Sequence, residues 1–172
     1  MDIAEIINDK ALRAKQKAEA LSKLLLNNKI SADDLIAFAE TVKDSTKATC
    51  IEALEFATKE DPNIATKKCF HFVSSTLTDK APRVKWESAR VIANTAYLFR
   101  DKLGEAIKNL LINSEHEGTV VRWSAAVALS EIVKLKTKHN KELLPAIEAI
   151  CKREEQNSIR KIYLDAIKKV KA

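Results

Sequence analysis

The segment from Thr119 to Val133, with the sequence TVVRWSAAVALSEIV, constrains the fold more than any other part of the chain. Its apolar residues fall on one face of an α-helix because they are separated by four, three and four positions, at Val121, Ala125, Ala128 and Ile132. Related segments recur at intervals of 37 or 38 residues, with a basic residue in one equivalent slot at Lys47, Lys85, Arg122 and Arg160. A second slot is aliphatic throughout, at Leu54, Ile92, Leu129 and Ile167. Such a period is typical of stacked helical hairpins, each of which buries its apolar face only against its neighbours.

The composition favours helices along the whole chain. Only two glycines and three prolines occur among 172 residues, so few positions demand a turn or interrupt a helix. We therefore predict an all-α protein with about ten helices in five consecutive pairs, forming one domain over residues 1–172. The predicted pairs cover residues 1–28, 31–59, 62–99, 101–136 and 139–172.

Local signals predict where several helices begin. Ser31 followed by Asp34 resembles a capping box, in which the two side chains bond each other's backbone N–H groups. Proline is tolerated at the first helical position, so Pro62 after Asp61 predicts one helix start. Pro82 predicts another, for a helix that continues to about residue 99.

The sequence also indicates a compartment. Its N-terminus has no basic start followed by an apolar core, and no apolar run approaches the length of a bilayer span. We expect a cytoplasmic protein that does not enter a membrane. Cys50, Cys69 and Cys151 are odd in number and stand at or beside apolar helical positions, which favours reduced thiols over disulfides.

Six residues of the segment from Thr119 to Val133 resemble the consensus of HEAT repeats, namely Val121, Arg122, Ala125, Ala126, Ala128 and Leu129. A weaker copy stands at Val84, Lys85, Ala89 and Ile92. The resemblance implies a right-handed α-α superhelix, or armadillo-type solenoid, whose second helices line a concave face. It also implies an internal ladder in which Asp44, Asp79, Glu115 and Glu154 neutralise the basic slot. Ser130, Ala93 and Glu55 stand where the family often has glycine.

The outward rows of the second helices differ in character. Three rows read as ordinary solvated faces: Lys15, Glu19, Ser22; Ala48, Glu52, Glu55, Lys59; and Lys161, Asp165, Lys168. The other two rows read Trp86, Arg90, Ala93, Tyr97 and Trp123, Val127, Ser130, Lys134. Exposed aromatic residues beside arginine are typical of binding hot spots. We therefore predict that a protein or peptide binds at Trp86, Arg90, Tyr97, Trp123, Val127 and Lys134.

A structural role for the two tryptophans is an open alternative, in which they lie over the neighbouring repeat and close the core. A nucleic-acid ligand is a second alternative, because the net charge is +6 and alkylpurine DNA glycosylases are built from similar helical repeats. However, the 24 acidic residues are interspersed with the 30 basic ones, and neither aromatic row holds the carboxylate that base excision would need. A resemblance to the HEAT-like pigment lyases rests on the fold alone.

Enzymatic chemistry has no candidate residues in the sequence. We find no glycine-rich phosphate loop, no Ser-His-Asp arrangement and no paired catalytic carboxylates. His71, His116 and His139 lie in different turns and helices without a second ligand at metal spacing. A single His-Glu pair, His116 and Glu117, falls short of the several pairs that the HEAT-repeat deoxyhypusine hydroxylases use for iron. We expect neither a metal nor a cofactor, and we predict a non-enzymatic interaction scaffold.

Overall fold

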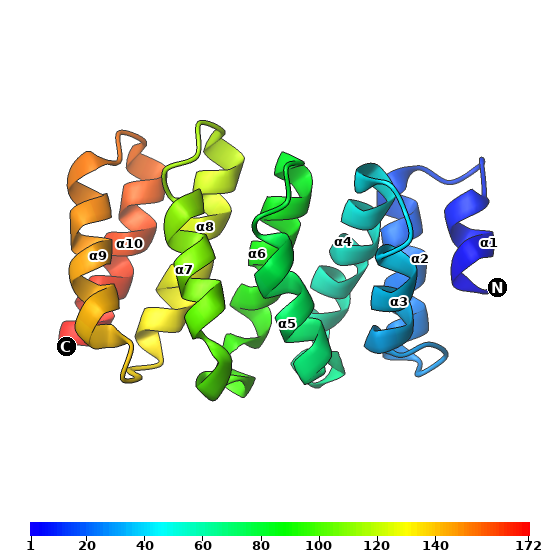
Figure 1. Cartoon of the computed structure of the whole chain (residues 1–172), viewed down its shortest axis with the longest axis horizontal. Helices are drawn as coiled ribbons and strands as arrows, with labels where there is room; N and C mark the ends of the chain where they lie inside the picture. The colour runs from blue at the N-terminus through cyan, green and yellow to red at the C-terminus, as the bar shows by residue number, and fades with distance from the viewer.

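The computed structural model describes all 172 residues and contains ten α-helices and no β-strand (Figure 1). The helices are α1 (Ile3–Asn8), α2 (Ala14–Leu26), α3 (Ala32–Ala39), α4 (Asp44–Glu60), α5 (Lys67–Thr76), α6 (Pro82–Thr95), α7 (Gly104–Asn113), α8 (Thr119–Lys134), α9 (Asn140–Arg153) and α10 (Asn157–Lys171). Three short 3-10 turns cover Pro62–Ile64, Ala96–Leu98 and Arg100–Lys102. None of the helices combines the length and the apolar character needed to cross a membrane.

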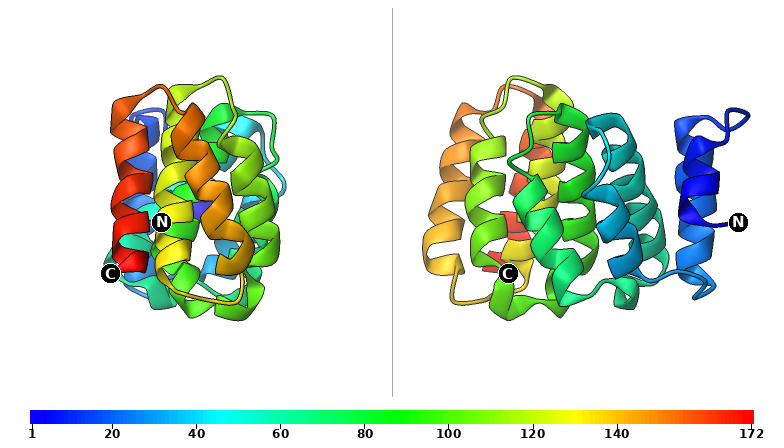
Figure 2. Two further views of the ribbon diagram at one scale, coloured as in Figure 1. Left: turned by 90° about the vertical axis from the view of Figure 1, so that its left-hand side faces the viewer. Right: turned by 45° about the vertical axis from the view of Figure 1, so that its right-hand side comes forward.

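The helices form two layers that run the length of the molecule (Figures 1 and 2). The even-numbered helices α2, α4, α6, α8 and α10 pack side by side in chain order. In the other layer α3, α5 and α7 contact one another in sequence, and each odd-numbered helix packs on the even-numbered helix that follows it. The short helix α1 contacts α2 at the N-terminal end of the row. The predicted all-α solenoid of helical hairpins is therefore confirmed.

One continuous apolar core lies between the two layers. Leu54, Ile92 and Leu129, which share one repeat slot, are at most 1% exposed. Small residues allow α8 to approach its neighbours closely, since Ala125, Ala126 and Ala128 are fully buried. The stripe identified in the segment from Thr119 to Val133 therefore serves the stacking of repeats, as its recurrence predicted.

Two predicted helix starts are confirmed. Ser31 Oγ accepts a hydrogen bond from the backbone N–H of Asp34 at 3.0 Å, and the Asp34 carboxylate accepts one from the N–H of Ser31 at 2.9 Å. This arrangement is the predicted capping box. Pro82 is the first residue of α6, as expected from its missing N–H.

Two other boundaries differ from the prediction. Pro62 opens only a 3-10 turn, and α5 begins later because Thr66 Oγ1 caps it by accepting a hydrogen bond from the N–H of Cys69 at 3.0 Å. Helix α6 ends at Thr95 instead of near residue 99. The chain turns there so that Phe99 packs inward on Phe70, with 4.8 Å between the ring centroids. A tertiary contact thus overrides the helical pattern of that segment.

The charged ladder implied by the HEAT resemblance is present in part. Lys47 pairs with Asp79 at 3.3 Å and Arg122 pairs with Glu154 at 3.2 Å, so each of these ion pairs joins one repeat to the next. Lys85 instead donates to the carbonyl of Leu77 at 3.3 Å. Glu115, another acidic residue of the implied ladder, pairs with Arg153 at 3.5 Å instead of with a residue of the basic slot.

Tyr163 of α10 is fully buried, and its hydroxyl oxygen has no hydrogen-bond partner. The equivalent slot holds smaller residues in the inner repeats, at Cys50, Ser88 and Ala125. A buried hydroxyl without a partner costs about 1–3 kcal/mol of stability. We therefore expect Tyr163→Phe to raise the free energy of unfolding by about 1 kcal/mol in urea denaturation. A decrease would instead show that the hydroxyl is bonded in solution, for example to a buried water.

Candidate functional site

The two tryptophans of the predicted site differ in exposure. Trp123 on α8 is 37% exposed, whereas Trp86 on α6 is half-buried. The indole N–H of Trp86 donates to Glu87 Oε1 at 2.9 Å, which fixes the ring against its own helix. Trp123 therefore presents more of its surface to solvent than Trp86 does.

Arg90 connects three of the even-numbered helices. Its Nη2 atom lies 3.0 Å from Glu55 Oε1 on α4, and its guanidinium carbon lies 5.9 Å from the centroid of the Trp123 ring on α8. A guanidinium at this distance is attracted to the π-face of an indole. The structure thus brings Arg90 close to Trp123, and the Glu55 carboxylate holds the arginine by an ion pair.

The row Ala48, Glu52, Glu55, Lys59 was predicted to be solvated, and this prediction is wrong for its first three residues. Ala48 is 1% exposed and Glu55 is 2% exposed, while the Glu52 side chain is half-buried and pairs with Arg83 of α6. Ser22 and Ser130 of the corresponding rows are buried as well. The reason is that neighbouring even-numbered helices cover one another's sides, so the buried arc is wider than the apolar stripe alone.

Glu87 is a residue of this site that the sequence analysis missed. It is 4% exposed, and its Oε2 atom, like Oε2 of Glu55, is buried without a hydrogen-bond partner. Burial, reinforced by the nearby negative charge of Glu52, raises the pKa of Glu87 to about 7. Burial also raises the pKa of Glu55. One signal was available in the sequence, because the equivalent slot of the neighbouring repeats holds the polar residues Thr49 and Ser124. Both are buried in the structure.

Two further predicted site residues, Val127 and Lys134, line a groove of about 260 Å³ between α8 and α10. Val127, Ile162 and Ala166 supply apolar surface to this groove. Its charged lining consists of Glu131, Lys134, Asp165 and Lys169. Lys134 is held by an ion pair with Glu131 at 2.7 Å. The groove can therefore accept an apolar side chain between charged walls.

Tyr97 does not stand on a helix of the site, unlike the other predicted site residues. It was expected on α6, but it stands on the 3-10 turn Ala96–Leu98 and is 48% exposed. We define the α6–α8 surface as Trp86, Arg90, Trp123, Val127 and Lys134.

The histidines and cysteines have local roles. The Nδ1 atom of His116 accepts a hydrogen bond from the backbone N–H of Gly118 at 2.8 Å, which closes the turn before α8. No group of three His, Cys, Asp or Glu side chains is placed to hold a metal ion. Cys50 and Cys69 are free and buried, and burial raises the pKa of each thiol to about 12.

No protein-family model and no curated protein sequence matches the chain. Solved structures are similar, including a designed armadillo repeat protein for modular peptide recognition, at 14% identity and a TM-score of 0.75 over 97% of this chain and 80% of that one. A designed armadillo repeat protein in complex with the peptide (KR)4 has 14% identity and a TM-score of 0.70, over 98% and 80%. The phycocyanin lyase complex from Nostoc sp. contains a similar chain, with 18% identity and a TM-score of 0.73 over 95% and 96%. Together with the ten stacked helices, these likenesses show that the chain has the HEAT/armadillo-type α-solenoid fold.

Proposed function

We propose that this protein is a non-enzymatic scaffold that binds a peptide or an extended protein segment along the α6–α8 surface. The observation that carries the proposal is the exposed indole of Trp123, which lies beside the Arg90 guanidinium that Glu55 holds by an ion pair. A large aromatic side chain held in place in this way loses little conformational freedom when a partner covers it.

Apolar contact area continues from Trp123 in both directions along α8. Val120 precedes it by three positions and is 49% exposed, and Val127 follows it by four positions and lines the groove beside α10. These spacings place the three side chains on one side of the helix. A partner lying across α8 could therefore cover Trp123 and insert an apolar side chain beside Val127.

The charged residues around this row would set the orientation of a bound segment. Arg90 and Lys134 can donate to carbonyl or carboxylate oxygens, while Asp165 can accept from backbone N–H groups. The designed armadillo proteins for modular peptide recognition share the architecture, which supports the same general use here. Because these contacts involve fixed helices, the site requires little rearrangement on binding.

Selection from a displayed random-peptide library provides the test, followed by affinity measurement through tryptophan fluorescence and calorimetry. We expect Trp123→Ala to weaken a selected peptide by about 30-fold, since a hot-spot residue contributes about 2 kcal/mol. Ile112→Ala is the matched control, because Ile112 is 60% exposed but lies on α7 in the other layer. Unchanged affinity in the Trp123 variant, or an equal loss in the Ile112 variant, would contradict the proposal.

A nucleic-acid ligand remains the alternative for the same surface, and a separate test addresses it. Arg90, the cation beside Trp123, is already paired with Glu55, which reduces the attraction of this surface for a phosphate backbone. We therefore expect no retention on a DNA column at physiological salt. Retention that persists there and decreases in the Trp123→Ala variant would favour the alternative.

A further inference from the structure

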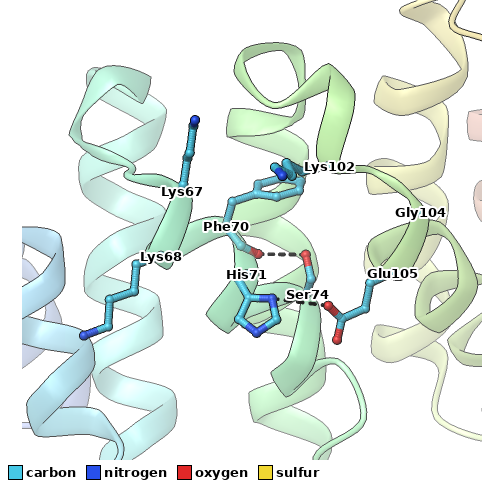
Figure 3. A pocket seen from close by; sticks show the side chains of 8 residues that line it. All are labelled: Lys67, Lys68, Phe70, His71, Ser74, Lys102, Gly104 and Glu105. Carbon is cyan, nitrogen blue, oxygen red and sulfur yellow. Dashed lines mark hydrogen bonds and ion pairs between the residues drawn. The ribbon is translucent and has the colours of Figure 1, made fainter.

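A second cavity lies in the layer of odd-numbered helices and shares no residue with the α6–α8 surface. It opens between α5 and α7 and has a volume of about 550 Å³ (Figure 3). Helix α5 contributes Lys67, Lys68, Phe70 and His71, and α7 contributes Glu105. The 3-10 turn before α7 contributes Lys102. The cavity is within the usual size range of sites for small molecules.

The charge of this cavity is not balanced from within. Lys67, Lys68 and Lys102 line it, and none of their ammonium groups has an ion pair or a hydrogen bond, in contrast to Lys47 and Lys134. Glu105 is the one carboxylate in the lining, and it is paired with His71 at 3.4 Å between Oε2 and Nδ1. Three lysine side chains against one carboxylate leave the lining with a net positive charge, which favours an anionic ligand.

The floor beneath these lysines is fixed. Phe70 is 1% exposed and stacks on Phe99, and Ser74 Oγ donates to the Phe70 carbonyl at 2.7 Å. The long methylene chains of the lysines add apolar surface around the opening. The cavity therefore offers apolar walls together with cations, a combination that suits an organic anion better than a bare inorganic one.

The start of α7 adds to the positive potential that the lysines create. Leu103, the residue before α7, supplies no side-chain cap, and a Cβ atom built on Gly104 would meet nothing within 4 Å. The first backbone N–H groups of an α-helix have no acceptor within the helix, and Leu103 supplies no side-chain acceptor here. Oxygen atoms of an anion could accept hydrogen bonds from them while a lysine ammonium group approaches from the other side.

We propose that the cavity between α5 and α7 binds a small organic phosphate of about nucleotide size, with Lys67 and Lys102 contacting its phosphate groups. Its apolar part lies against the lysine methylene chains. This binding site is separate from the proposed peptide site, so either can be correct without the other.

The experiment titrates ADP into the isotopically labelled full-length protein and follows backbone amide signals by NMR. We expect ADP to shift the signals of residues 67–74 and 102–106 and to bind at least tenfold more tightly than adenosine or inorganic phosphate. The double variant Lys67→Gln, Lys102→Gln should weaken ADP binding at least tenfold. Lys108→Gln is the matched control, since Lys108 is an exposed lysine of α7 outside the cavity lining, and it should change the affinity less than twofold.

Several outcomes would overturn the proposal. Absence of shifts at millimolar ADP would show that the cavity does not bind this class of ligand. An equal loss of affinity in the Lys108 variant would show that ADP binds the positive charge of the chain without a defined site. Equal affinity for adenosine would remove the role of the phosphate, and equal affinity for inorganic phosphate would remove the role of the apolar walls. Circular dichroism of the variants checks that the helices are retained.

Discussion

Replacing Glu87 with glutamine is expected to raise the free energy of unfolding by up to about 3 kcal/mol at pH 8, and by much less at pH 4.5. In the folded protein burial raises the pKa of Glu87 from an ordinary value of 4.5 to about 7. The unfolded chain therefore releases this proton first as the pH rises. The stability contributed by the protonated form is fully present below pH 4.5 and is lost as the pH rises through about 7. Glutamine stays neutral and can still accept the hydrogen bond from Trp86.

Urea denaturation of both proteins between pH 4.5 and pH 8 measures this effect as a difference between two curves. Glu55 is present in both proteins, so its own raised pKa largely cancels. Glu105→Gln serves as the control, because Glu105 is exposed and its replacement should change stability by less than about 0.5 kcal/mol. Parallel pH profiles for the wild type and the Glu87 variant would show that the carboxyl group is not desolvated as the structure indicates.

Replacing Leu129 with alanine is expected to lower the free energy of unfolding by about 2–5 kcal/mol. Leu129 is fully buried in α8, and packed repeats on both sides leave little room for the cavity to collapse. Ile167 occupies the same slot in α10 but is only partly buried, because α10 packs against one even-numbered helix, α8, whereas α8 packs against two. Ile167→Ala should therefore cost less than Leu129→Ala, although both substitutions remove aliphatic side chains of equal size.

Thermal and urea denaturation of these two variants tests whether the core behaves as a stack of repeats. In such a stack the inner repeats receive two interfaces and the terminal repeat receives one. Equal losses for Leu129→Ala and Ile167→Ala would contradict this picture. That result would indicate that a second molecule covers the C-terminal repeat in solution. Sedimentation of the wild type in the analytical ultracentrifuge would then detect the dimer.

Short-range patterns account for what could be predicted about the fold. The apolar spacing in each segment selects helices, and the recurrence at 37 or 38 residues selects stacked hairpins. The start of α3 was predictable because Ser31 and Asp34, which cap each other's backbone N–H groups, lie within one turn. The end of α6 was not, since it depends on a contact between Phe99 and Phe70 from another helix.

The candidate site was predictable only in part. Its residues on α6 and α8 could be proposed from equivalent repeat slots, and the structure places Arg90 against Trp123. Glu55 was assigned to a solvated row because a sequence does not show how much of α4 is covered by α6. Glu87 was overlooked for the same reason, although it lies next to Trp86 in the chain.

The sequence by itself determined the all-α class, the repeat length and the residues of the buried stripe, because these follow from spacing within one helix and between similar helices. Only the tertiary structure decided which polar side chains became buried and which tryptophan stayed exposed. It also formed the cavity between α5 and α7, where Lys67 and Lys102 line one opening although 35 residues separate them. Such environments depend on distances between helices, and those distances are set by how complete side chains pack against one another.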